Sequence, residues 1–283
     1  PAGMATPLGV YLTTGSVTGG AGDLGLFLTG VSLSLMTMFA GAIVFGLEGL
    51  FARLTGIPLM AYLQSPPIST PNLLDVPFFV STALTVAIFG VLMRLSPLSG
   101  YHAAEHMTVH AKEAGEVLTP DAVRRMPRVH PRCGTNLLAA VGIFTIITER
   151  LGTGFGTLMA LLVVVLGWRT VGGWMQYFIT TKNPSEKQLA AGVAAGNQLI
   201  ERYQERPNFH LTGFDRIWKM GFVQTMSGMA AVSGLLAGLA DEAVGAGAVL
   251  PPASLALTSS TIARNCASVT ILVASAMATI SRY

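Results

Sequence analysis

Long apolar runs recur along the chain and are separated by segments that carry most of the charge. Each run approaches the roughly 20 residues that an α-helix needs to cross about 30 Å of hydrocarbon. The pattern therefore predicts an all-α fold with five or six membrane helices, the third and fourth joined as a hairpin by the turn GTGFG. The runs are residues 24–50, 74–95, 136–150, 155–178, 221–240 and 251–280, the last being weakest because Arg264 and Asn265 interrupt it.

A polar segment at residues 97–134 predicts two helices outside the membrane. Residues 101–114 are rich in Ala, Glu, Met and Lys, and Gly115 is typical of a helix end. Thr119 and Pro120 then predict the cap and the first residue of a short second helix. Two prolines break the chain after it, so that HPRCG forms a turn into the third apolar run.

A second polar segment predicts one amphipathic helix, in the sequence PSEKQLAAGVAAGNQLIERYQE at residues 184–205. Asn183 or Ser185 is suited to cap its start. Its modest apolar stripe is typical of a solvated helix that lies on the rest of the protein or on the lipid surface.

The composition supports a membrane protein and orients its loops. Of the 283 residues, 51% are hydrophobic and only 11% are charged, so a water-soluble globule is a poor explanation. Five of the 17 basic residues lie in 97–134 and six in 179–220, and basic loops face the cytoplasm in bacterial membrane proteins. We therefore expect a multi-pass protein of the bacterial inner membrane, surrounded by lipid, with both segments in the cytoplasm.

The same composition excludes several classes of partner and processing. A net charge of +3 is too small and too scattered to indicate a nucleic-acid partner. No basic segment with a cleavage pattern precedes the first run, so we expect no cleavable secretory signal. The two cysteines fall in a cytoplasmic segment and in an apolar run, and we expect no structural disulfide.

Histidines gather on one face of the first polar helix. Three of the five histidines lie at positions 102, 106 and 110, and at 100° per residue they share a stripe about 80° wide with Glu113. Glu105 lies at the side of that stripe. His130 and Cys133 follow two proline breaks later, where the chain could fold back over the helix.

These residue types in this spacing predict a metal site. Imidazole nitrogen, thiolate sulfur and carboxylate oxygen suit zinc or iron, and helical positions i and i+4 can hold one ion from one side. A divalent metal, with zinc as the expected ion, is therefore the predicted cofactor. The candidate ligands are His102, His106, His110, Glu113, His130 and Cys133.

Two residues near the ligands are candidates for chemistry if the metal is catalytic. Glu105 could take a proton from water that the metal activates. Arg132, or alternatively Arg128, could stabilise a developing oxyanion or bind an anionic head group. Either arginine is explained equally well as an anchor at the cytoplasmic lipid surface.

Two alternatives to this metal site stay open for the histidine group. Single histidines are usually structural, hydrogen-bonded residues, and the arrangement EHxxxH differs from the HExxH of the common zinc peptidases. Axial ligation of haem or chlorophyll is the second alternative, and it is disfavoured because the group lies in a basic, polar segment.

Residues 101–136, YHAAEHMTVHAKEAGEVLTPDAVRRMPRVHPRCGTN, resemble the signature of the DUF1385 (YqhQ-like) family of bacterial membrane proteins. The family pattern runs approximately YHGAEHKT, then Glu-x-Gly, then HPRCGT. Residues 174–195, WMQYFITTKNPSEKQLAAGVAA, resemble a second family segment, W-x-Q-x-x-T-T-x-x-P, and the helix after it.

The resemblance implies an integral membrane protein, a predicted metal-dependent enzyme, and favours a hydrolase. His110 is not part of the motif, which favours His102, His106, His130 and Cys133 as ligands. By position the motif falls on His102, Glu105, His106, Thr108, Glu113, His130, Pro131, Arg132, Cys133, Gly134 and Thr135.

The chain departs from the family pattern at both ends. The N-terminal stretch keeps little of a glycine-rich GGQAVIEGVMMRG-like segment beyond its glycines, and it lacks the charged residues. We expect a DUF1385-like membrane domain at residues 1–206, which includes the metal-site loop 97–134. Residues 207–283 then form an apolar extension with one or two further membrane helices.

These departures keep a second function in view, that of a non-catalytic subunit of a larger membrane complex with a structural metal site. Ala230, Gly234 and Gly238 recur at four-residue spacing, and such small residues let membrane helices approach closely. This face could pack internally or against another membrane subunit.

Overall fold

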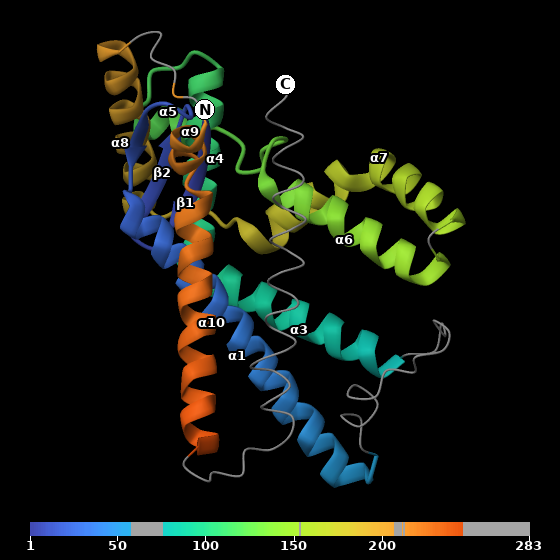
Figure 1. Ribbon diagram of the computed structural model, residues 1–283. Helices are drawn as coiled ribbons and strands as arrows, with labels where there is room; N and C mark the ends of the chain where they lie inside the picture. The colour runs from blue at the N-terminus through green and yellow to red at the C-terminus, as the bar shows by residue number, and fades with distance from the viewer. Residues whose placement is uncertain (58–75, 153, 207–210, 212, 246–283) are drawn as a thin grey trace.

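The protein is described here from a computed structural model, which covers residues 1–57, 76–152, 154–206, 211 and 213–245. A small sheet and several helices cluster at one end of the molecule, which we call the head (Figure 1). Long apolar helices extend from the head, as the sequence predicts.

The N-terminal stretch forms a three-stranded antiparallel sheet, so the all-α prediction is wrong for this part of the chain. The strands are β1 (Ala2–Thr6), β2 (Gly9–Thr13) and β3 (Thr18–Gly20), paired in the order β1-β2-β3. All five residues of β2 are buried, and burial of both faces removes the alternation of polar and apolar residues that marks a half-exposed strand.

Helix α4 (Leu98–Glu113) runs through the centre of the head. It packs against β1 and β2 on one side and against α8 (Glu186–Glu205) and α5 (Pro120–Arg124) on others. Gly192 lets α8 approach, because a Cβ atom there would lie 2.6 Å from the Thr108 hydroxyl. The histidine-bearing helix is therefore covered by protein on most of its surface.

The predicted helix signals in the head are confirmed. The Thr119 side chain caps α5 by accepting from the Ala122 amide, and Pro120 is its first residue. Ser185 rather than Asn183 caps α8, and it forms a reciprocal capping box with Gln188.

Helix α3 (Val76–Leu95) leads into α4 through a bend of 70°. Two basic side chains at the bend donate hydrogen bonds to backbone carbonyls. Arg94 donates to the carbonyls of Tyr177 and Thr181, and Lys182 donates to those of Leu95 and Ser96. These contacts tie the bend to the segment that follows α7.

The predicted hairpin is formed by α6 (Gly134–Leu151) and α7 (Phe155–Met175), which lie side by side in Figure 1. A five-residue π-helix, η1 (Gln176–Thr180), ends α7. Such π-helical turns are rare in proteins, and those that occur often lie at functional sites. Here the turn brings the chain back to the head.

Helices α1 (Asp23–Thr55) and α10 (Phe222–Gly245) cross closely, and the short α9 (Phe214–Lys219) precedes α10. The crossing depends on two glycines. A Cβ atom at Gly30 would lie 1.9 Å from the Thr225 carbonyl, and one at Gly228 would lie 2.0 Å from the Phe27 carbonyl. The small-residue face expected from the sequence is not the one used, because Gly234 and Gly238 have no described atom within 4 Å of an added Cβ.

Two helical segments are long and apolar enough to cross a membrane, α1 and the continuous α7–η1 segment Phe155–Thr180. The bent α3–α4 pair is a third candidate by length and composition. Large apolar side chains stand exposed on the first two, such as Leu54 at 77% and Leu166 at 75% exposure. The apolar parts of α6 and α10 are shorter, at Gly134–Thr148 and Phe222–Leu236.

The described residues thus support two or three membrane spans where the sequence predicts five or six. The expected sixth run, 251–280, lies outside the described residues, as do Cys266 and His210. Because α4 is enclosed by the sheet, α5 and α8, we treat it as part of the head.

We expect Gly228→Val to destabilise the protein by about 1–3 kcal/mol, because the added methyl groups push α10 away from α1. Gly234→Val on the same helix is the matched control, since an added Cβ there has none of the described residues within 4 Å. Thermal unfolding in detergent measures both. Equal unfolding temperatures for the two variants would contradict the close crossing.

Candidate metal centre

The histidines of α4 form a row together with one histidine from the turn before α6. His102, His106 and His110 lie on one face of the helix, as their four-residue spacing predicts. Ring centroids are 4.3 Å apart for His102 and His106, 5.6 Å for His106 and His130, and 4.6 Å for His110 and His130. Four imidazoles are therefore contiguous.

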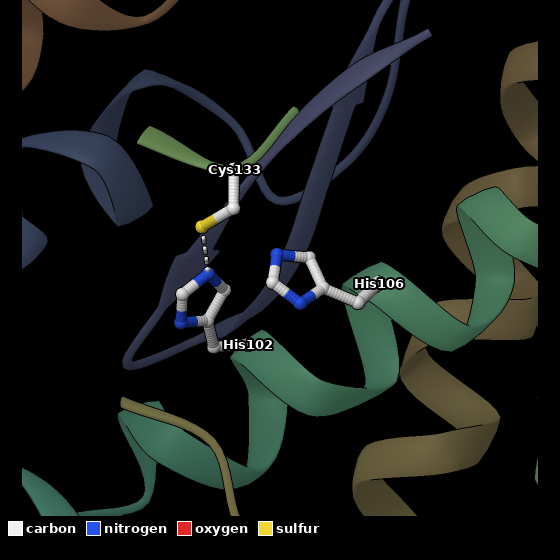
Figure 2. Close-up of side chains that lie close together, drawn as sticks. All are labelled: His102, His106 and Cys133. Atoms are coloured by element: carbon white, nitrogen blue, oxygen red, sulfur yellow. Dashed lines mark hydrogen bonds between the residues drawn. The ribbon is translucent and has the colours of Figure 1, made fainter. Parts of the chain in front are cut away.

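The predicted turn HPRCG does fold back over α4. Cys133 is the N-cap residue of α6, and its sulfur accepts from the Thr135 amide. The same sulfur lies 3.3 Å from Nε2 of His102. Figure 2 shows His102 and His106 on successive turns of α4, with Cys133 approaching from the separate segment.

The donor atoms of His102, His106 and Cys133 all lie within 4.8 Å of one another; we call these three residues the first triad. Ligand atoms around a tetrahedral zinc ion, with bonds of about 2.0–2.3 Å, lie about 3.3–3.8 Å apart. The 3.3 Å separation of Cys133 Sγ and His102 Nε2 is close to that spacing.

Backbone carbonyls fix the tautomers of both histidines in the first triad. Nδ1 of His106 lies 2.7 Å from the Arg128 carbonyl, and Nδ1 of His102 lies 3.0 Å from the Thr180 carbonyl. A carbonyl can only accept, so each Nδ1 carries the ring proton and each Nε2 keeps a free lone pair. This is the outer-shell arrangement typical of metal-binding histidines.

Burial keeps these groups uncharged. It lowers the pKa of His106 to about 2, with a further contribution from the neighbouring His102, and it also lowers the pKa of His102. Burial raises the pKa of the Cys133 thiol. Two neutral imidazoles are thus ready to bind a cation, whereas Cys133 must lose a proton to become a thiolate ligand.

Glu105 lies beside the first triad, as its place next to His106 predicts. Its Oε2 is 3.4 Å from His106 Nε2, and the residue is only 5% exposed. Burial is the main cause that raises its pKa, to about 7, while His102 acts in the opposite direction. A carboxyl group with such a pKa can exchange protons near neutral pH.

The N-terminal strand covers Glu105, although it lacks the charged residues of the family pattern. A Cβ atom at Gly3 in β1 would lie 2.3 Å from Oε1 of Glu105. Only glycine leaves room for the carboxyl group at this position. The strand therefore shapes the site through its backbone.

The remaining predicted ligands, His110, Glu113 and His130, form a second triad whose donor atoms also lie within 4.8 Å of one another. Nε2 of His110 donates to the Val129 carbonyl at 3.0 Å, which leaves its Nδ1 free. Glu113 pairs with Arg132. The six predicted ligands are therefore divided between two neighbouring groups.

The two candidate arginines have different surroundings. Arg132 is exposed at the edge of the second triad, where it pairs with Glu113. Arg128 lies with its guanidinium carbon 4.0 Å from the centre of the Tyr177 ring and donates to the Asn183 side chain. Of the two, Arg132 is the one at the exposed rim of the histidine row.

Sequence reasoning assigned no role to two buried amides that hold the turn. Gln176 is fully buried, accepts from the His130 amide at 2.8 Å and donates to the Asn136 side chain at 2.8 Å. Asn136 in turn donates to the Pro131 carbonyl at 2.8 Å. For Gln176 the signal was its place in the W-x-Q-x-x-T-T segment, although that segment does not indicate which residues Gln176 contacts.

The profile of the family described as "Protein of unknown function (DUF1385)" matches residues 73–168. Over this region the chain is similar to the DUF1385 family. The region contains α3, α4, α5, α6 and most of α7, and so all six candidate ligands, whereas Gln176 and Thr180 lie just beyond it.

A relative of the DUF1385 region is "Uncharacterized protein YqhQ" from Bacillus subtilis (strain 168), which is 28% identical over 126 residues. The match covers 35% of this chain and 39% of the relative, so it spans about two fifths of the relative's length. No solved structure matches the chain.

We expect Gln176→Leu to destabilise the protein by about 1–3 kcal/mol, because it leaves the His130 amide and Asn136 side chain buried without this partner. It should also weaken metal binding about 10- to 100-fold, as loss of outer-shell support does elsewhere. Thermal unfolding and metal titration measure the two effects. Gln204→Leu, at the exposed end of α8, is the control, and equal values for both variants would show that Gln176 does not support the site.

Proposed function

We propose that the DUF1385 region forms a metal centre in which His102, His106 and Cys133 bind one divalent cation, zinc by the chemistry of the donors. The proposal rests mainly on the tautomers of His102 and His106, which backbone carbonyls fix by accepting from each Nδ1. Each Nε2 is therefore unprotonated, and these donor atoms lie within 4.8 Å of the Cys133 sulfur. Nitrogen and sulfur donors together favour zinc over magnesium or calcium.

We place this centre at the cytoplasmic face of a bacterial inner membrane that the chain crosses several times. Two or three apolar helices of the right length support membrane insertion. The basic residues support the orientation, because eleven of 17, five in 97–134 and six in 179–220, lie in the segments that flank the centre.

Hydrolysis is the reaction class that the surroundings of the first triad favour. A bound zinc ion supplies a Lewis acid that makes water nucleophilic near neutral pH. Glu105, 3.4 Å from His106 Nε2, would accept the proton of that water at Oε2. Its raised pKa suits it to return the proton to a leaving group.

Arg132 would receive the substrate. It stands at the exposed rim of the histidine row, and a guanidinium binds carboxylate or phosphate oxygens with two parallel hydrogen bonds. An anionic group, such as a lipid head group or a developing oxyanion, is therefore the chemistry expected there.

A structural metal site is the second candidate, and one observation favours it. Glu105 lies outside the group of donors within 4.8 Å of one another, but its Oε2 is 3.4 Å from His106 Nε2, so a movement of its side chain toward the triad would supply a fourth ligand. A closed set of four protein ligands is typical of structural zinc. The centre would then fasten the turn before α6 to α4. Exposed Ala230, Gly234 and Gly238 would remain available to another membrane subunit.

One double variant tests the metal centre, and a Glu105 variant separates the catalytic from the structural candidate. Metal content of the purified chain should fall to background in the double variant His106→Ala, Cys133→Ala, and unchanged content would reject the centre. If the site is catalytic, Glu105→Gln should keep the metal and lose turnover of 4-nitrophenyl ester and phosphate probes by about 100-fold or more.

If the site is structural, Glu105→Gln should instead weaken metal binding and lower the unfolding temperature. Glu116→Gln is the matched control, since Glu116 is an exposed carboxylate that follows α4. A Glu105 variant indistinguishable from this control in metal content, turnover and stability would exclude both roles for Glu105.

A further inference from the structure

We infer that the DUF1385 region binds a second cation next to the first, between His110, Glu113 and His130. The inference rests on the proposed metal centre of the first triad, which supplies the neighbouring ion. Two imidazoles and a carboxylate are a donor set that suits zinc, manganese or ferrous iron. Their donor atoms lie within 4.8 Å of one another.

A buried nitrogen without a well-formed hydrogen bond points to a ligand at this place. His130 is only 5% exposed, and within the described part of the chain its Nε2 has no hydrogen-bond partner. That nitrogen faces Glu113, whose Oε2 is 3.5 Å away. A contact of this length satisfies the nitrogen poorly, and native proteins usually pair a buried polar atom closely with protein, water or an ion.

His110 completes the set. Its Nε2 donates to the Val129 carbonyl, which leaves the lone pair of Nδ1 free for a cation. The same carbonyl-fixing device holds His102 and His106 in the first triad, although there Nδ1 donates and Nε2 stays free. The second triad therefore has one histidine whose tautomer is fixed and whose second nitrogen is unprotonated.

Arg132 occupies the other two ligands of the second triad, Glu113 and His130, and so competes with a second cation. Its guanidinium pairs with Glu113, and its backbone amide donates to Nδ1 of His130 at 3.2 Å. Binding through Nε2 of His130 moves the ring proton to Nδ1, so the Arg132 amide must turn away while its side chain leaves Glu113. Movement of one residue thus frees two ligands.

The two triads share no residue, yet they adjoin. His106 of the first and His130 of the second have ring centroids 5.6 Å apart. Hydrolases that use two metals hold them about 3.5–4 Å apart and clamp the oxygens of one substrate between them. The first triad should fill first, because both of its histidines already have free Nε2 atoms, whereas the second must displace Arg132.

The test counts cations per chain. Tag-free, metal-stripped full-length protein in detergent is titrated with Zn²⁺, desalted and analysed for bound metal. We expect two equivalents in the wild type and in the Glu116→Gln control. His110→Ala and Glu113→Gln should each bind one, and Arg132→Ala should bind the second equivalent more tightly than the wild type.

The possible outcomes test the second site separately from the first triad. One equivalent in the wild type, lost in the His106→Ala, Cys133→Ala double variant and kept in His110→Ala, overturns the second site and leaves the first. Two equivalents that survive Glu113→Gln and His110→Ala overturn the assigned position. No bound metal in the wild type overturns both. Circular dichroism and elution as a single species confirm that each variant is folded.

Discussion

Two hydrogen bonds from imidazole Nδ1 atoms to backbone carbonyls are the constraint on which the site depends. The carbonyls belong to Arg128, in the segment before the HPRCG turn, and to Thr180, at the end of η1. Segments far apart in the sequence must therefore meet α4 before His102 and His106 acquire a defined tautomer and direction. Without them, these side chains would be two ordinary histidines one helical turn apart.

Other contacts within the head hold the Arg128 and Thr180 segments against α4. Gln176, in the π-helical turn, joins the His130 amide to Asn136, and Arg94 and Lys182 tie the α3–α4 bend to the same return of the chain. The sheet and α8 cover the other faces of α4, which removes water from Glu105 and the imidazoles. Burial and fixed geometry thus arise from the same contacts, and both suit the binding of a cation by these side chains.

Local signals in the sequence predicted what depends on neighbouring residues. Helix spacing placed the histidines of α4 on one face, Thr119 and Ser185 marked helix starts, and the prolines predicted a turn that brings Cys133 back. The sheet was missed because fully buried β2 has no alternating pattern. The division of the six ligands into two triads, and the role of Gln176, depend on contacts across 19 to 46 residues that no local pattern encodes.

The most direct test of the metal centre is X-ray absorption spectroscopy at the zinc edge of the purified protein loaded with one equivalent of zinc per chain. We expect a mixed shell, with one sulfur at about 2.3 Å and nitrogen or oxygen atoms at about 2.0–2.1 Å. The sulfur contribution should be absent from Cys133→Ala. A shell of light atoms only in the wild type, or an identical spectrum in the variant, would contradict it.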